Sequence, residues 1–141
     1  GAEGYYKSGI RAAMEFTAAN TPVKYQHGVK IDDAYIASYL EGPQVKFGAS
    51  ATENLNRIYK QKYILYFLQH EWDAFFECRR TGVPELPVNP STNMNTDPSK
   101  MLVRWMYPQT EYDRHNANVM EAIARQYDGL DNENCVMWLL K

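Results

Sequence analysis

The sequence lacks features that define several large classes of protein. No run of residues approaches the roughly 20 apolar positions that a membrane-spanning helix needs, and none has the pattern of a signal peptide. Lys and Arg number 15 against 17 Asp and Glu, for a net charge of −2, and the basic residues are scattered. No nucleic-acid-binding stripe is therefore expected.

Cysteine and histidine are also scarce. Cys78 and Cys135 lie far apart in the sequence, so one disulfide is possible, but two free thiols are the favoured interpretation. His27, His70 and His115 stand alone, without a second ligand at the spacing of a metal site.

Motifs of catalysis and cofactor binding are missing as well. The sequence has no nucleophile elbow, phosphate loop or dinucleotide fingerprint. The acidic stretch from Asp128 to Cys135 does not match the alternating carboxylates of a calcium-binding loop, so it is predicted to be a solvated turn. We therefore expect no enzyme activity, no cofactor, no metal and no catalytic residue.

The 141 residues suit one domain, and their apolar periodicity predicts a mainly α fold. The expected architecture is a helical-repeat-like packing of about four helices, with short extended segments and a long proline-rich loop. The third and longest helix is apolar all round at its centre and is expected to break near His70. The predicted helices cover residues 5–19, 32–43, 50–82 and 110–127.

Local signals mark the ends of these helices. Asp32 is a candidate N-cap for the second helix, and Ser50 has capping-box spacing with Glu53 at the start of the third. Gly82 ends the third helix. Thr110 is predicted to begin the last helix.

Between the last two predicted helices lies a stretch rich in turn-forming residues. Residues 83–102 contain four prolines and three asparagines. Loops of this length without structure of their own are usually functional or mobile. The next residues, "LVRWMY" (102–107), alternate in polarity and predict a short extended segment.

Four polar residues stand out in the second half of the chain. Arg80 ends the long helix, Arg104 precedes Trp105, and Glu111 opens the last helix. Since arginine pairs well with carboxylates, either arginine could pair with Glu111 in a shielded ion pair. The set could clamp an anionic ligand, but a structural tie between elements is the favoured interpretation. Asn116, on the apolar face of its helix, is expected to be buried and to bond nearby backbone.

These residues also carry a family resemblance. "NRIYKQKYILYFLQHEWDAFFECRRTGVPEL" followed by "VRWMYPQTEYDRHNANV" resembles the C-terminal part of SusD/RagB-like outer-membrane lipoproteins of Bacteroidetes. The matching positions are Ile58, Gln61, Lys62, Tyr63, Ile64, Trp72, Arg79, Arg80, Thr81, Gly82, Pro84, Arg104, Tyr107, Pro108, Glu111 and Asn116.

The resemblance implies a cell-surface, lipid-anchored protein that binds a glycan or another nutrient for a TonB-dependent SusC-like transporter. It implies a binding protein rather than an enzyme. Family members are several times longer, so residues 1–141 are expected to form a single domain that is the C-terminal, structural portion of such a protein. No ligand residue carries over from the resemblance; Trp105, whose ring could stack on a sugar, is the only candidate.

Periodicity by itself supports an alternative, a helical protein–protein interaction module without a small-molecule ligand. The segment "YILYFL" (63–68) is apolar all round, so a partial chain is expected to expose it on at least one side. Self-association through the faces of residues 5–19 and 50–69 would cover that surface.

Overall fold

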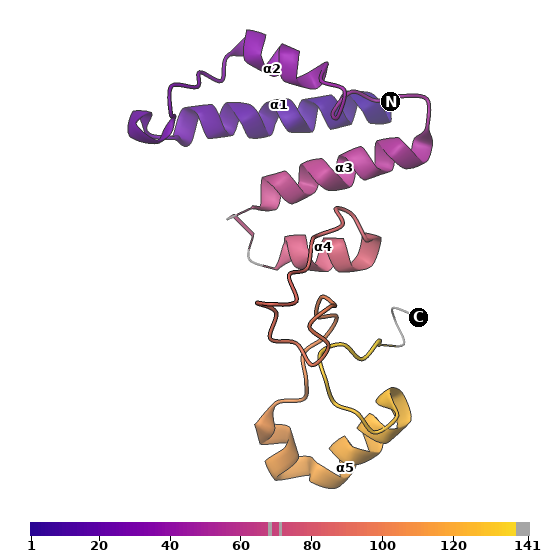
Figure 1. The fold of residues 1–141 in the computed structure, drawn as a ribbon. Helices are drawn as coiled ribbons and strands as arrows, with labels where there is room; N and C mark the ends of the chain where they lie inside the picture. Colours follow the sequence, from indigo (N-terminus) through magenta and orange to yellow (C-terminus); the bar gives the residue numbers. More distant parts are fainter. Residues whose placement is uncertain (68, 71, 138–141) are drawn as a thin grey trace. The chain divides into compact units, whose positions relative to one another are not determined.

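The structure is a computed structural model that describes residues 1–67, 69–70 and 72–137. The chain forms two compact units, residues 1–84 (unit 1) and residues 85–141 (unit 2). Every regular element in the described residues is helical, and none of them is a β-strand, which confirms the mainly α prediction (Figure 1).

The described residues of the two units form five α-helices and one 3-10 turn. Unit 1 contains the 3-10 turn at Val23–Tyr25 and four of the helices, and unit 2 contains the fifth. The helices are α1 (Ala2–Asn20), α2 (Asp33–Leu40), α3 (Ala51–Tyr66), α4 (Asp73–Thr81) and α5 (Gln109–Tyr127). None of the helices in the described residues is long and apolar enough to cross a bilayer.

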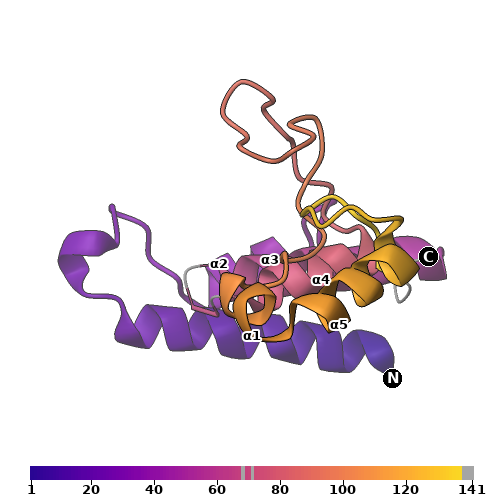
Figure 2. The same cartoon turned by 90° about the horizontal axis from the view of Figure 1, so that it is seen from below.

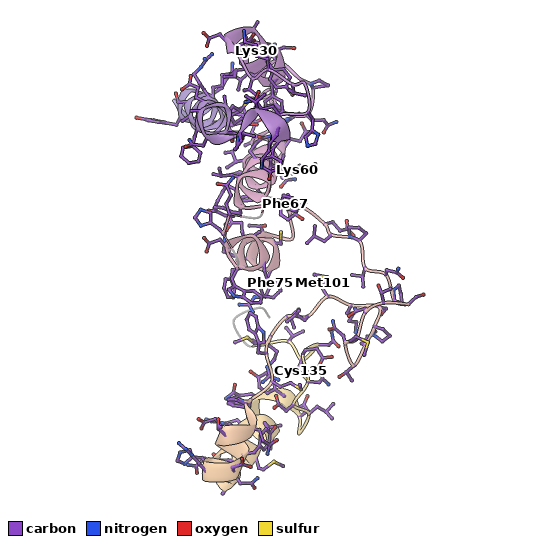
Figure 3. All side chains as sticks on the ribbon, turned by 90° about the vertical axis from the view of Figure 1, so that its left-hand side faces the viewer. Lys30, Lys60, Phe67, Phe75, Met101 and Cys135 are labelled. Atoms are coloured by element: carbon purple, nitrogen blue, oxygen red, sulfur yellow. The ribbon has the colours of Figure 1, made fainter. Side chains whose placement is uncertain are left out.

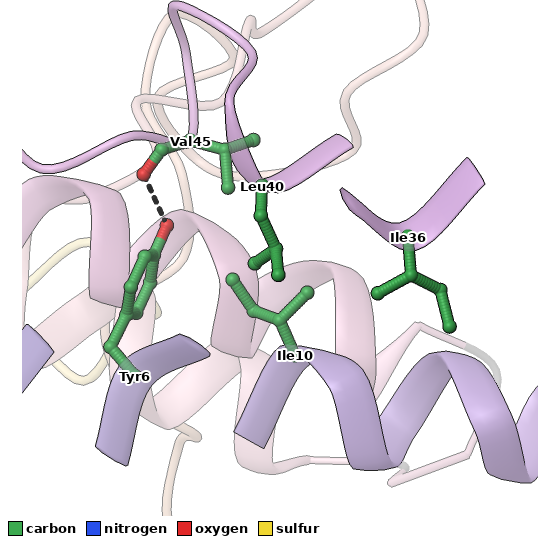
Figure 4. Packing of buried hydrophobic residues seen from close by; sticks show 5 residues of the cluster. All are labelled: Tyr6, Ile10, Ile36, Leu40 and Val45. Carbon is green, nitrogen blue, oxygen red and sulfur yellow. Dashed lines mark hydrogen bonds between the residues drawn. The ribbon is translucent and has the colours of Figure 1, made fainter. Parts of the chain in front are cut away.

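The core of unit 1 lies between α1 and α2. Tyr6 and Ile10, one turn apart on α1, are buried against Ile36 and Leu40 of α2, and Val45 follows in the next turn of the chain. Figure 4 shows this cluster, including the Tyr6 hydroxyl that donates a 2.8 Å hydrogen bond to the Val45 carbonyl. The hydrogen bond fixes the chain after α2 against α1.

The expected helix signals of unit 1 are confirmed. The Asp32 side chain accepts a hydrogen bond from the Tyr35 N–H at 3.0 Å, and Ser50 accepts one from the Glu53 N–H at 3.3 Å. Gly82 ends α4 in the left-handed conformation, with φ of 70°, and its N–H bonds the Cys78 carbonyl.

The long helix predicted for residues 50–82 forms as two helices, which confirms the expected break near His70. α3 ends at Tyr66, Phe67 has an extended ψ of 119°, and α4 begins at Asp73. Leu68, the last residue of the "YILYFL" segment, lies outside the described residues. α3 packs on both α1 and α4, and the three helices lie side by side in Figures 1 and 2.

An ion-pair cluster joins α3 to α4. Glu77, mostly buried on α4, accepts hydrogen bonds from Lys62 of α3 at 2.6 Å and from Arg80 of its own helix. In Figure 3, Lys60 and Phe75 mark the two helices. Arg80 thus ties the end of α4 to the α3–α4 contact.

Unit 2 contains no β-strand in its described residues. In the segment predicted to be extended (residues 102–107), the N–H groups of Val103 and Arg104 both donate to one carbonyl, that of Glu133, rather than to a ladder of carbonyls, and the chain bends at Arg104. The prediction that Thr110 begins the last helix is wrong. α5 begins one residue earlier, with Pro108 at the N-cap and no side-chain cap.

The Tyr6 hydrogen bond gives the first testable prediction. Replacing Tyr6 with Phe keeps the ring, which stacks on Phe47 at 4.5 Å, but leaves the buried Val45 carbonyl without its donor. We expect a loss of about 1–2 kcal/mol in the free energy of unfolding, measured by urea denaturation. Tyr5→Phe is the matched control, because Tyr5 is 83% exposed and should give no measurable change. Equal midpoints for the two variants would contradict the role of the bond.

Candidate functional site

An apolar groove runs between α1 and α3 in unit 1. Its volume is about 410 Å³. On α1 it is lined by residues spaced three or four apart, and on α3 by a matching set. The lining includes Gly9, Ala13 and Thr17 of α1 and Ile58, Ile64 and Leu65 of α3.

Four of the polar side chains that line this groove are engaged in bonds within the unit. The Lys62 ammonium binds Glu77, the Tyr39 hydroxyl donates to Gln61 at 3.0 Å, and the Thr17 hydroxyl donates to the Ala13 carbonyl. A sugar needs several free donors and acceptors that fix its hydroxyl groups. The chemistry of the groove therefore favours an apolar occupant.

Large apolar side chains surround the groove and face solvent. Ile64 is 57% exposed and Phe67 61% exposed. Tyr5 and Leu65, both in the lining, are exposed as well. These residues lie on the two faces, residues 5–19 and 50–69, that the sequence predicts for self-association.

A buried ion pair organises unit 2. Arg104 is 4% exposed, and its guanidinium donates to the Asp131 carboxylate at 2.5 Å and to the Asn132 carbonyl at 3.0 Å. It also lies 4.1 Å from the centre of the Tyr127 ring, at the end of α5. Arg104 thus connects the extended segment before α5 to the helix and to the turn that follows it.

Asp131 completes the network with two more hydrogen bonds. The hydroxyl of Tyr112 donates to it at 2.6 Å and the N–H of Tyr107 at 3.0 Å. Burial acts to raise the pKa of Asp131, but the hydrogen bonds from Tyr112, Arg104 and Tyr107 and the positive charge of Arg104 outweigh it and lower the pKa below its usual value. Asp131 is therefore held as a carboxylate.

The identity of this partner corrects two predictions. Arg104 pairs with Asp131 and not with Glu111, because the turn after α5 brings Asp131 back to the extended segment. The prediction that the turn is solvated is wrong at Asp131, whose side chain is only 8% exposed. The cluster of Asp, Asn and Gly at residues 128–134, directly after the last helix, is the signal that could have indicated a bonded turn.

The other expected motif residues have different surroundings. Arg80 pairs with Glu77 in unit 1, so its pairing with Glu111, which belongs to unit 2, stays a prediction. Asn116 is exposed on α5, which contradicts its expected burial. The buried positions of that helix are Val119, Ile123 and Tyr127, and Asn116 lies one turn before the first of them.

Trp105, the ligand candidate, is 49% exposed and follows the buried Arg104 directly. An exposed indole can stack on the apolar face of a sugar ring. The role of Trp105 in ligand binding stays a prediction.

The remaining reactive groups form no site in the described part of the chain. Cys78 and Cys135 are free, partly buried thiols, and burial raises the pKa of the Cys78 thiol. Among residues 1–67, 69–70 and 72–137, no three His, Cys, Asp or Glu side chains come together where they could hold a metal ion.

Comparisons with known proteins give one consistent result. Residues 1–108 match the family model of SusD-like proteins, which is described as starch-binding and associating with the outer membrane. A SusD homologue from Bacteroides fragilis is 43% identical over 99% of the chain, with a TM-score of 0.87. A second B. fragilis homologue is 37% identical over 100% of the chain, with a TM-score of 0.82.

A third solved structure, from Bacteroides vulgatus, is described as an outer-membrane protein probably involved in nutrient binding. It is 30% identical over 99% of the chain, with a TM-score of 0.76. The chain spans only 30%, 30% and 29% of these three proteins. No curated protein sequence matches the chain significantly.

The Arg104–Asp131 pair predicts a strong and pH-dependent effect of Asp131→Asn. Leaving the buried guanidinium without its carboxylate should cost about 3–5 kcal/mol of unfolding free energy at pH 7. Since folding lowers the pKa of Asp131, the carboxylate stabilises the fold above the ordinary pKa of Asp, about 3.9. Its contribution is lost as pH falls through the lower folded value.

The difference in unfolding free energy between wild type and Asp131→Asn should therefore be largest at pH 5–7 and should shrink below about pH 4. Urea denaturation across this range measures it. Glu111→Gln is the control and should change the free energy by less than about 0.5 kcal/mol. A larger loss of unfolding free energy for Glu111→Gln than for Asp131→Asn would contradict this pairing and would make Glu111 the partner of Arg104, as the sequence suggests.

The open groove predicts self-association of the 141-residue chain. We expect light scattering to give a molar mass above that of a monomer, rising with concentration, because large apolar side chains of both helices that line the groove face solvent. Ile64→Glu should shift the chain to monomer. Leu55→Glu, on the same helix at a position that is also exposed but does not line the groove, should not. A wild-type chain that is monomeric at high concentration would contradict the prediction.

Proposed function

Because this chain belongs to the SusD-like family, we propose that it is the C-terminal, structural portion of a longer nutrient-binding protein at the outer membrane. The observation that carries the proposal is the match of almost the whole chain, at 43% identity, to 30% of a SusD homologue's length. The longer protein binds a glycan, and the part described here supports the fold that presents the binding surface.

The internal bonding of the chain supports this structural role. Of the motif residues, Arg104 and Arg80 each have a carboxylate partner within their own unit, Asp131 and Glu77. Such bonds hold elements together, and they leave the buried guanidinium of Arg104 little capacity for a ligand. The proposed glycan site accordingly lies mainly in the rest of the polypeptide, with Trp105 as the one contributing residue from this chain.

The proposed partner is a TonB-dependent SusC-like transporter that takes up the captured nutrient. A lipid anchor outside residues 1–141 would hold the longer protein at the cell surface. The proposed activity is binding without turnover, which agrees with the description of the family as starch-binding.

One feature favours a second candidate. The groove in unit 1 is apolar and lined by faces of two helices, α1 and α3, a form typical of surfaces that bind a helix. A helical interaction module would bind a partner's helix in that groove and would bind no small-molecule ligand. Saccharide binding by the longer protein separates the two candidates, since only the first requires it.

Affinity electrophoresis in gels containing soluble starch, followed by calorimetric titration with maltooligosaccharides and other glycans, tests the proposal. The protein at the length of its relatives should be retarded and should release no reducing sugar on long incubation. The 141-residue chain should migrate without retardation. Steady release of reducing sugar would contradict the binding role, and absence of binding to every glycan tested would favour the interaction module.

Trp105 gives a prediction at the level of one residue. In the longer protein, Trp105→Ala should weaken glycan binding by roughly 5- to 100-fold, which corresponds to the loss of about 1–3 kcal/mol from one stacked ring. Trp72→Ala is the matched control, because Trp72 is exposed to a similar degree, 52% against 49%, and is not proposed to touch ligand. Equal effects of the two changes on affinity would remove Trp105 from the site.

A further inference from the structure

The groove between α1 and α3 has the length and periodicity of a binding site for one more helix. Its α1 wall contains Tyr6, Ile10 and Thr17 at intervals of about one or two turns, and its α3 wall contains Ile58 and Leu65 two turns apart. From Tyr5 to Thr17 the wall extends for roughly 18 Å at about 1.5 Å per residue. A helix of about three turns with an apolar stripe matches both the length and the periodicity.

Gly9 provides an independent sign that something approaches α1 closely. It lies inside the helix, where glycine is unfavourable relative to alanine, and its φ is not one that requires glycine. A Cβ built on Gly9 would meet no other atom within 4 Å, so nothing in the described residues explains why a side chain is absent. Together with Ala13, Gly9 leaves a shallow floor on which another backbone can lie.

The bonding of the groove favours an apolar helix over a sugar. Lys62, Gln61 and Thr17, which supply polar groups to its lining, each have a partner within unit 1. An occupant there gains mainly from burying apolar surface. An amphipathic helix offers that surface, and the backbone donors and acceptors between its end turns are satisfied within the helix itself.

The source of such a helix is indicated by the length of the relatives. Three solved relatives contain a fold like this one within chains more than three times as long. We propose that an amphipathic helix of the same polypeptide, outside residues 1–141, occupies the groove between α1 and α3. This inference rests on the proposed function only in that the chain is part of a longer protein.

The substitution Gly9→Leu tests the proposal, because its effect should change sign with the length of the protein. In the 141-residue chain, at concentrations where light scattering shows monomer, it should raise the melting temperature by roughly 2–4 °C, since leucine is the better helix former and its Cβ would meet no atom within 4 Å. In the protein at the length of its relatives, the leucine would meet the docked helix. The melting temperature should fall there by at least about 5 °C.

Gly4→Leu is the matched control. Gly4 lies on the same helix, a Cβ on it also meets nothing within 4 Å, and it does not line the groove. It should raise the melting temperature, or leave it unchanged, at both lengths. Gly9→Ala is the milder variant to use if Gly9→Leu prevents the longer protein from folding, and it should show the same change of sign at smaller amplitude.

Three results would overturn the proposal. The first is a rise in melting temperature for Gly9→Leu at both lengths, as for Gly4→Leu. The second is a longer protein that is a dimer and that Gly9→Leu converts to folded monomers, which would make a second copy the occupant. The third is a groove that, in the longer protein, is shielded from solvent only when a glycan is added, which would make the glycan its occupant. Because the readout is stability without ligand, a failure of glycan binding alone would leave this inference standing.

Discussion

The fold of unit 2 depends on the ion pair between Arg104 and Asp131. On α5, only Val119, Ile123 and Tyr127 are buried among the described residues, which is a small apolar core for a unit with a long irregular segment. Arg104 extends that core by lying against Tyr127, while Asp131 gathers a guanidinium, a backbone N–H and a phenol around one carboxylate. Three stretches of chain that form no sheet with one another are thereby fixed by polar contacts.

Unit 1 is stabilised differently. Its helices bury an apolar cluster between α1 and α2, and an ion-pair cluster around Glu77 joins α3 to α4. The groove between α1 and α3 is the place where this packing is incomplete. An apolar surface that is left open beside a satisfied polar network is typical of a piece that packs against further structure.

The sequence allowed prediction of those features that depend on neighbouring residues. The caps at Asp32 and Ser50, the glycine end of α4 and the break near residue 70 all follow from local chemistry and were confirmed. The partner of Arg104 could not be predicted in the same way, because it depends on how the chain folds back after α5. Glu111 and Asp131 are equally plausible partners until the path of that turn is known. Asn116 shows the same limit, since its place on an apolar stripe does not decide which end of the stripe is buried.

In the account that we propose, the shared motif residues are architectural and the nutrient is bound largely by the rest of a longer protein. A double-mutant cycle with Arg104→Met, Asp131→Asn and the double variant tests the central point of this account most directly. The unfolding free energies should show a coupling of at least about 2 kcal/mol, because each single change leaves a buried charged or polar group without its partner. Additivity within about 0.5 kcal/mol would show that the two residues act independently, and Arg104 could then no longer be assigned a purely structural role.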